Sequence, residues 1–195
     1  MTEARRQLIV VDTETTGLGP DSMPLEIAAV NVDTGEELYF VPAGALEAAR
    51  KADPEALAVN RFFERRVDKH ELRIAETNDY YIALWDMLRG NTLAGSNPAF
   101  DASVLVRGYK HSRAMQVDPE TPWHHRLADL AAYAAPALGR SPSDTPGLNV
   151  VLDALGVENI CPHSALGDAL ATAEAFRRLR EMYTRTSFAV MGGAQ

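Results

Sequence analysis

The sequence predicts an α/β domain in which helices flank a mixed sheet. Two observations indicate this class. Three short, apolar, β-like segments follow one another near the start, and afterwards segments of helical periodicity alternate with a further strand. The length of 195 residues and a composition of 46% apolar and 24% charged residues are typical of one globular domain.

The first three elements are predicted as strands over residues 7–12, 25–32 and 37–41. Each is rich in apolar residues and is bounded by turn-forming residues. Asp33, Thr34 and Gly35 separate the second segment from the third, which is a strong signal for a tight turn. We therefore expect a hairpin at this position.

Most of the remaining elements are predicted as helices. Asp53 with Pro54, and Asn97 with Pro98, place a capping residue before a proline at the first helical position. An irregular segment over 139–147 separates two short helices. The predicted helices span residues 43–51, 54–60, 75–89, 97–109, 127–135, 149–155 and 164–183, with a strand over 91–95 between the third and the fourth.

The most informative motif is Asp12-Thr13-Glu14 at the tip of the first strand. Successive side chains of a strand point to opposite faces, so Asp12 and Glu14 share one face. Two carboxylates this close repel each other unless a cation lies between them, and a divalent metal ion is the usual solution. The motif therefore predicts a metal-dependent site for phosphate chemistry.

Taken alone, this triplet is weak evidence. With 27 acidic residues in 195, chance predicts roughly one Asp-x-Glu triplet. The chain holds two others, beginning at Asp53 and Asp118, but both have proline in the middle and neither follows an apolar strand. The alternative interpretation of the first triplet is a solvated strand end.

Two further carboxylates lie on helix faces that should turn toward the core. Asp101 shares a face with Val104 and Leu105, and Asp168 leads an apolar stripe in the last helix. His163 comes just before that helix. His124 and Asp129 repeat the spacing of His163 and Asp168, so spacing alone cannot separate the two pairs; the long amphipathic helix favours the second pair.

Charge and cysteine content limit the function classes. The net charge of −8 argues against a protein that coats nucleic acid through a basic field. The single Cys161 excludes an internal disulfide and suits a reducing compartment. Neither a membrane span nor a signal peptide is visible, so we expect a cytoplasmic location and no membrane partner. We expect one domain over residues 1–184 and a short C-terminal tail over 185–195.

Three ordered motifs resemble the DEDDh, or DnaQ-like, 3′→5′ exonucleases of the RNase H-like superfamily. They begin at Asp12, at Gly95 and at His163, and read DTETTGL, GSNPAFD and HSALGDALAT. Matching segments also lie at Leu25–Val30 and around Asp129, a family position that binds no metal. The resemblance covers nearly the whole chain. It implies an RNase H-like mixed five-stranded sheet, with three antiparallel strands followed by parallel strands, flanked by helices.

The resemblance also implies the roles of the site residues. Four carboxylates would hold two divalent ions, Mg²⁺ or Mn²⁺, roughly 3.5–4 Å apart. Asp12 would contact both ions, Glu14 and Asp168 the ion that activates water, and Asp101 the other ion. His163 would be the general base, and because a base must be neutral, activity should rise through the titration range of histidine near pH ~6.5. The residues expected to seat the terminal nucleotide are Thr15, Thr16, Gly17, Leu18, Asn97 and Phe100.

The implied function is hydrolysis of phosphodiester bonds from the 3′ end of single-stranded nucleic acid, with release of nucleoside 5′-monophosphates. DNA is the favoured polymer; RNA and short oligonucleotides stay open, because no residue discriminates the 2′-hydroxyl. A DNA polymerase or a sliding clamp is a further candidate partner. Residues 185–191 resemble clamp-binding tails, although a frayed terminus is the favoured interpretation.

Two alternative functions are a non-catalytic binding subunit with a nuclease fold and a haloacid-dehalogenase-like phosphatase. The phosphatase needs a second aspartate where Glu14 stands and a lysine at a suitable strand end, which the chain lacks. The sequence also departs from the family at Asn60-Arg61, where many members have His-Gly, and at Ser96. Arg61, Arg65 and Arg66 are candidates for guiding phosphates, but a solvated helix face is the favoured interpretation.

Overall fold

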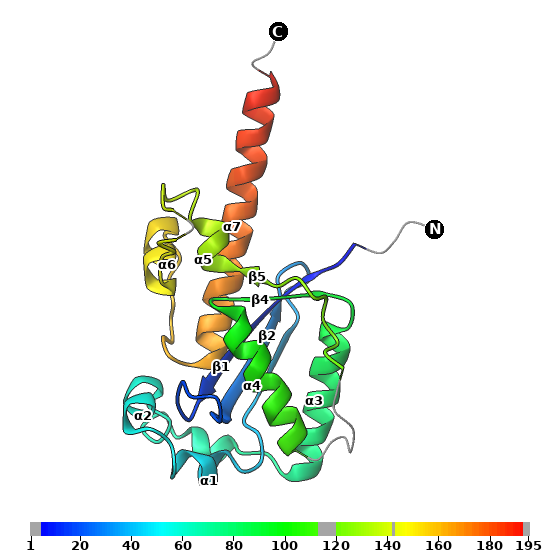
Figure 1. Cartoon of the computed structure of the whole chain (residues 1–195), viewed down its shortest axis with the longest axis vertical. Coiled ribbons are helices and arrows are strands. Elements are labelled where there is room, and N and C mark those ends of the chain that lie inside the picture. Colours follow the sequence, from blue (N-terminus) through cyan, green and yellow to red (C-terminus); the bar gives the residue numbers. More distant parts are fainter. Residues whose placement is uncertain (1–4, 113–119, 142, 193–195) are drawn as a thin grey trace.

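The fold is built around a five-stranded mixed sheet (Figure 1). The computed structural model describes residues 5–112, 120–141 and 143–192, and side chains through residue 185. The strand order is β3-β2-β1-β4-β5, in which β1, β2 and β3 are antiparallel neighbours and β4 and β5 continue the sheet in parallel. The predicted arrangement of three antiparallel strands followed by parallel strands is confirmed.

The predicted strands and helices occur in the predicted order along the chain. The strands are β1 (Leu8–Thr15), β2 (Pro24–Asn31), β3 (Glu37–Phe40), β4 (Thr92–Gly95) and β5 (Ala128–Asp129). The helices are α1 (Ala45–Ala49), α2 (Pro54–Asn60), α3 (Ile74–Leu88), α4 (Pro98–His111), α5 (Leu130–Ala134), α6 (Leu148–Leu155) and α7 (Ala165–Gly192), with a short 3₁₀ helix η1 (Val67–His70) that was not predicted.

Helices cover both faces of the sheet, and the alternation of β1 side chains assigns each face. Ile9 and Val11 pack with α3 and α4, whereas Val10 packs with α5, α6 and α7. Because the side chains alternate strictly, Thr13 belongs to the α4 face and Asp12 and Glu14 belong to the α7 face. The central strand therefore delivers its two acids to the side on which α7 begins.

Helix α7 is the longest element and runs past the predicted end at residue 183 (Figure 1). No glycine or proline interrupts the chain between Gly167 and Gly192, so nothing in the local sequence terminates the helix at Tyr183. Ser164 precedes α7, and its Oγ accepts a hydrogen bond from the backbone N–H of Gly167 at 3.1 Å. The division into a domain over 1–184 and a tail over 185–195 stays a prediction.

Two local predictions were wrong in detail. The segment predicted as a helix over 127–135 begins with strand β5, and Asp129 then caps α5 by accepting backbone N–H bonds from Ala131 and Ala132. The two residues predicted as caps before a proline, Asp53 at α2 and Asn97 at α4, form no capping hydrogen bond through their side chains, and Asn97 adopts a left-handed backbone with φ 66°. None of the helices in the described part of the chain has both the length and the apolar character that crossing a bilayer requires.

Candidate active site

Three carboxylates converge where β1 ends and α7 begins. Asp12, Glu14 and Asp168 each offer an oxygen, and these oxygens all lie within 4.8 Å of one another. The pairing of β1 with β2 shifts register between Glu14 and Thr15, which marks the end of regular pairing at the motif. A close cluster of carboxylate oxygens is the donor set that hard divalent cations prefer.

Asp101 reaches the same region from the opposite layer. Its side chain, on α4, is 4% exposed and accepts a 2.8 Å hydrogen bond from the Thr13 hydroxyl. The strand β4 stops at Gly95, so α4 starts beside the end of β1 and can approach Asp12. The negative charge of Asp101 raises the pKa of Asp12, after burial itself. The site thus draws acids from both sides of the sheet.

Burial raises the pKa of every acid in this cluster, and repulsion by neighbouring carboxylates adds to the rise at Asp12 and Glu14. The pKa of Asp12 is raised by burial first and then by Asp101 and Asp168. Burial, followed by Asp168 and Glu26, raises the pKa of Glu14 to about 7. Burial also raises the pKa of Asp101 to about 7, against the hydrogen bond from Thr13. The neighbouring side chains supply too little positive charge to neutralise these carboxylates, so the residues present fit a divalent metal site.

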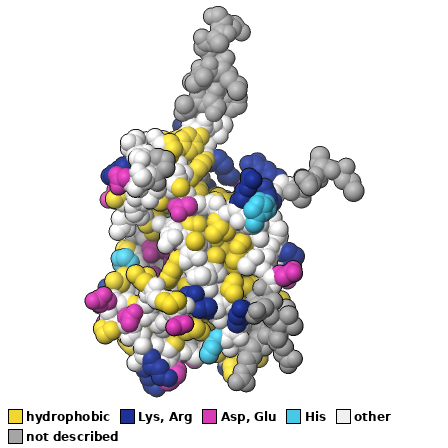
Figure 2. All heavy atoms as spheres, viewed as in Figure 1, with side chains coloured by type: hydrophobic (Ala, Val, Ile, Leu, Met, Phe, Trp, Pro, Cys, Tyr) yellow, Lys and Arg dark blue, Asp and Glu magenta, His cyan; other side chains and the backbone are white. Residues whose placement is uncertain are grey.

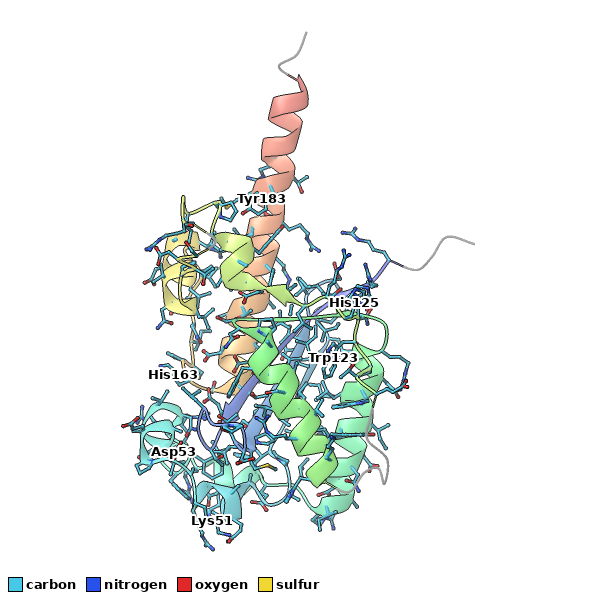
Figure 3. All side chains as sticks on the ribbon, in the orientation of Figure 1. Lys51, Asp53, Trp123, His125, His163 and Tyr183 are labelled. Carbon is cyan, nitrogen blue, oxygen red and sulfur yellow. The ribbon has the colours of Figure 1, made fainter. Side chains whose placement is uncertain are left out.

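His163 lies at the edge of this cluster, on the connection between α6 and α7 (Figure 3). It is exposed and adopts a left-handed backbone with φ 59°, a conformation that is uncommon for residues other than glycine. Burial raises the pKa of Asp168, while Asn159 and the charge of His163 oppose that rise. The structure therefore brings all five predicted catalytic residues to one region.

His124 lies elsewhere, among basic residues at the other end of β1. Burial lowers the pKa of His124, and the charges of Arg6 and His125 add to this effect. Basic side chains also gather near the N-terminal end of the described chain in Figure 2. Asp129, its partner in spacing, is occupied in capping α5. The repeated spacing was therefore a coincidence.

A cavity of about 470 Å³ lies next to the acid cluster. Its lining residues come from the end of β1, the loop that follows, α2 and α4: Thr13, Glu14, Thr15, Gly17, Leu18, Gly19, Asp53, Glu55, Ala56, Val59, Asn60 and Phe100. Four of the six residues expected to seat a nucleotide are among them. Thr16 and Asn97 are not, and the Thr16 hydroxyl accepts a hydrogen bond from the backbone N–H of Met23 instead.

The loop after β1 is closely packed against the start of α2. A Cβ atom on Gly17 would lie 2.2 Å from Oδ2 of Asp53, so no other residue fits at position 17 without movement. The backbone N–H of Asp53 donates to the Thr16 carbonyl at 2.8 Å. Leu18, by contrast, is 87% exposed at the rim of the cavity. The loop is therefore packed against the start of α2 and presents one apolar side chain to solvent.

Sequence reasoning missed several supporting residues. Asn159 donates a 2.5 Å hydrogen bond to Oδ1 of Asp168. Asn60, at the position where the sequence departs from the family, is buried and donates to the Thr15 carbonyl at 3.3 Å. Arg65 forms an ion pair with buried Glu26, so its assignment to a solvated face was wrong; Arg61 and Arg66 are exposed. No periodicity signals such pairs, because the partners lie on separate elements.

Comparison with known proteins identifies the family of this chain and agrees with its fold. Residues 9–176 match the family model described as RNase_T, exonuclease. Similar solved structures include E. coli exonuclease I in complex with a dT13 oligonucleotide (TM-score 0.67, 20% identity, 95% of this chain and 43% of that chain). The zinc-bound E. coli exonuclease I–ssDNA complex (0.66, 19%, 97% and 43%) and an exonuclease I from Methylocaldum szegediense (0.63, 20%, 91% and 41%) are also similar.

This chain spans less than half the length of those structures, whose likeness shows a shared fold. No curated protein sequence matched it. The family model covers most of the chain, from β1 into α7, and includes every residue of the acid cluster and His163. The chain therefore belongs to the RNase_T exonuclease family.

Proposed function

We propose that this protein hydrolyses single-stranded DNA from its 3′ end and releases nucleoside 5′-monophosphates. The observation that carries the proposal is the meeting of one buried carboxylate, three partly buried carboxylates and one exposed histidine beside an open cavity. Membership of the exonuclease family supports this reaction class. The oligonucleotides dT13 and dA16, bound in the similar E. coli exonuclease I structures, favour single-stranded DNA over RNA.

Each residue has a distinct role in the proposed reaction. Asp12, Glu14 and Asp168 would hold one divalent ion, and Asp12 with Asp101 a second. Bound divalent ions at such a site activate water and stabilise negative charge at the phosphate. His163 takes up the proton of the attacking water from its exposed position beside Asp168.

The cavity beside Glu14 is proposed to receive the terminal nucleotide. Leu18 and Phe100 supply apolar contact to a base or sugar, and Thr15 and Gly17 shape the wall between them. The predicted roles of Thr16 and Asn97 have no support from this cavity. To contact the terminal nucleotide, Thr16 and Asn97 would have to use backbone atoms, or the substrate would have to bind in a different arrangement.

A digestion assay tests the reaction. Single-stranded DNA and RNA labelled at the 5′ end, incubated with Mg²⁺ or Mn²⁺, should give a ladder of labelled products that shortens gradually from the 3′ end, with DNA cut faster. Immediate release of a labelled mononucleotide would indicate the opposite polarity. Release of inorganic phosphate from a phosphomonoester, without shortening of DNA, would favour the phosphatase alternative.

The role of His163 has its own matched control. His163→Ala should lower kcat by roughly 10²–10⁴-fold, because general base catalysis typically contributes that much. His125→Ala removes an exposed histidine outside the acid cluster and should leave kcat unchanged. Equal rates for the two variants would remove His163 from the mechanism. The cytoplasmic location and a polymerase or clamp partner stay predictions from the sequence.

A further inference from the structure

A fifth carboxylate lies beside the metal-binding acids. Glu26 of β2 is the register partner of Glu14 on β1, so both side chains project from the same face of the sheet. Glu26 is 1% exposed, and its charge raises the pKa of Glu14 after burial and Asp168. Counted with Asp12, Glu14, Asp101 and Asp168, it brings the formal charge of this region to −5 when all five carboxylates are ionised.

Arg65 is the cation that compensates Glu26. Its Nη1 donates to Oε2 of Glu26 at 3.2 Å, and its Nη2 contacts Oε1. The hydroxyl of Tyr39 completes the environment of Glu26 with a 2.8 Å hydrogen bond to Oε2. The charge of Arg65 also lowers the pKa of Glu14 and of Asp168, against the raising effect of burial. Its field therefore reaches the metal-binding acids themselves.

We propose that Arg65 is a positioning residue that balances the charge of the site. The positive charge of Arg65 offsets the negative charge of Glu26, so four negative charges are left at the site. Two divalent cations neutralise these four charges, and a phosphodiester can then approach. This inference rests on the proposed function. Arg65 does not touch the reacting atoms; it acts through Glu26 and sets the net charge that metal and substrate meet.

Arg65 also ties α2 to the sheet, and this second role needs a separate test. Its Nε donates to the Asn60 carbonyl at 2.7 Å, and Asn60 in turn donates to the Thr15 carbonyl. A tether alone would hold the cavity wall in place without affecting charge. A neutral substitution at Glu26 distinguishes the two roles. It should compensate for the loss of Arg65 if Arg65 balances charge, but not if Arg65 is only a tether.

The test uses Arg65→Met, Glu26→Gln and the double variant, with Arg89→Met as the control because Arg89 is an exposed arginine at the end of α3, outside the cavity. Arg65→Met leaves an excess negative charge. It should lower kcat/KM for single-stranded DNA by about tenfold or more, through KM, because the phosphodiester is repelled. The double variant restores neutrality and should recover most of the loss. Arg89→Met should match the wild-type protein.

Calorimetric titration of each folded variant with Mn²⁺ gives a readout that is independent of activity. Glu26→Gln leaves an excess positive charge and should weaken Mn²⁺ binding about tenfold. The double variant should bind Mn²⁺ like the wild-type protein, and Arg65→Met at least as tightly. A double variant as impaired in KM as Arg65→Met would show a tether and overturn the proposal, as would unchanged Mn²⁺ affinity in Glu26→Gln.

The variant Arg65→Lys is included in case Arg65→Met fails to fold. Lysine keeps the positive charge but cannot form the two-pronged contact with Glu26. This variant should retain wild-type KM and Mn²⁺ affinity to within about threefold; impairment equal to that of Arg65→Met would overturn charge balance. If the wild-type protein cut no nucleic acid while the order of Mn²⁺ affinities held, the proposed function would fail and the charge-balancing role would stand.

Discussion

Single side chains at the end of β1 are held in an unfavourable electrostatic environment. Burial and the negative charges of Asp101, Asp168 and Glu14 all raise the pKa of Asp12. Such a residue costs stability in the metal-free protein, and the proposed metal site accounts for its presence. Activity and stability should therefore respond in opposite directions when Asp12 is neutralised.

Asp12→Asn should lower kcat by at least about 10³-fold, since loss of a metal-binding carboxylate removes several kcal/mol of transition-state stabilisation. The metal-free variant should melt at a higher temperature than the wild-type protein, because one repelling charge is gone. Digestion rates and thermal unfolding in chelator measure the two effects. Asp79→Asn, on the exposed side of α3, is the control and should change neither. Normal turnover by Asp12→Asn would refute the site.

Leu18 offers a prediction about substrate binding alone. The side chain is 87% exposed, so Leu18→Ala should leave the melting temperature unchanged. It should raise KM for single-stranded DNA by roughly 5–150-fold, the range that loss of about 1–3 kcal/mol of contact with a base gives. Ile82→Ala, at a 50% exposed position on α3 outside the cavity, serves as the control. If both variants have wild-type KM, Leu18 does not contact the substrate.

At the scale of elements, the site exists because β1, α4 and α7 end or begin together. Their packing holds several ionisable groups in a low-dielectric region, and this links the stability of the metal-free protein to pH. Burial raises the pKa of Glu14 from 4.5 to about 7 and that of Asp101 from 3.8 to about 7. Between about pH 4 and pH 7, the folded state thus binds more protons than the unfolded state.

Because the folded state binds more protons there, the free energy of unfolding falls as pH rises through this window and levels off above it. We expect the melting temperature in chelator to drop from pH 5 to pH 7.5. Saturating Mn²⁺ should abolish or reverse the slope, because the ion binds the ionised carboxylates. Thermal unfolding across this range, with and without Mn²⁺, checks the prediction. A melting temperature that rises with pH in chelator would contradict it.

At the scale of the whole molecule, α7 extends beyond the body of the domain (Figure 1). Near its exit, the Tyr183 hydroxyl donates to the Tyr133 carbonyl at 2.7 Å, and the two rings pack edge to face. The predicted domain boundary at residue 184 follows this contact directly. The residues beyond it should therefore add little to folding or catalysis.

A chain that ends at Thr184 should keep its melting temperature to within about 2 °C and its kcat/KM on single-stranded DNA. Tyr183→Ala, in the full chain, is the contrasting variant. It should lower the melting temperature by several degrees, since loss of a packed aromatic ring costs more than about 1 kcal/mol. Calorimetry and digestion assays on both proteins test the boundary. A large loss of stability in the shortened chain would show that the tail belongs to the domain.

Much of the fold and the site could be predicted from local patterns. The bounds of α2 were predicted correctly because Asp53 and Pro54 mark its start in the sequence itself. The alternation of side chains along a strand predicted that Asp12 and Glu14 share one face. Helical periodicity predicted that Asp101 and Asp168 lie on the helix faces that point toward the core. The two-residue strand β5 was missed, because so short a segment has no period of its own.

The sequence by itself determined which acids and which histidine were the candidates, since local patterns place them at strand and helix ends and three ordered motifs resemble one family. Only the tertiary structure decided how they are supported: Thr13 bonds Asp101 across 88 positions, and Arg65 bonds Glu26 across 39. Periodicity reports which face of an element a residue occupies, but contacts between elements depend on how whole layers pack. For that reason the charge balance of the site became visible only in three dimensions.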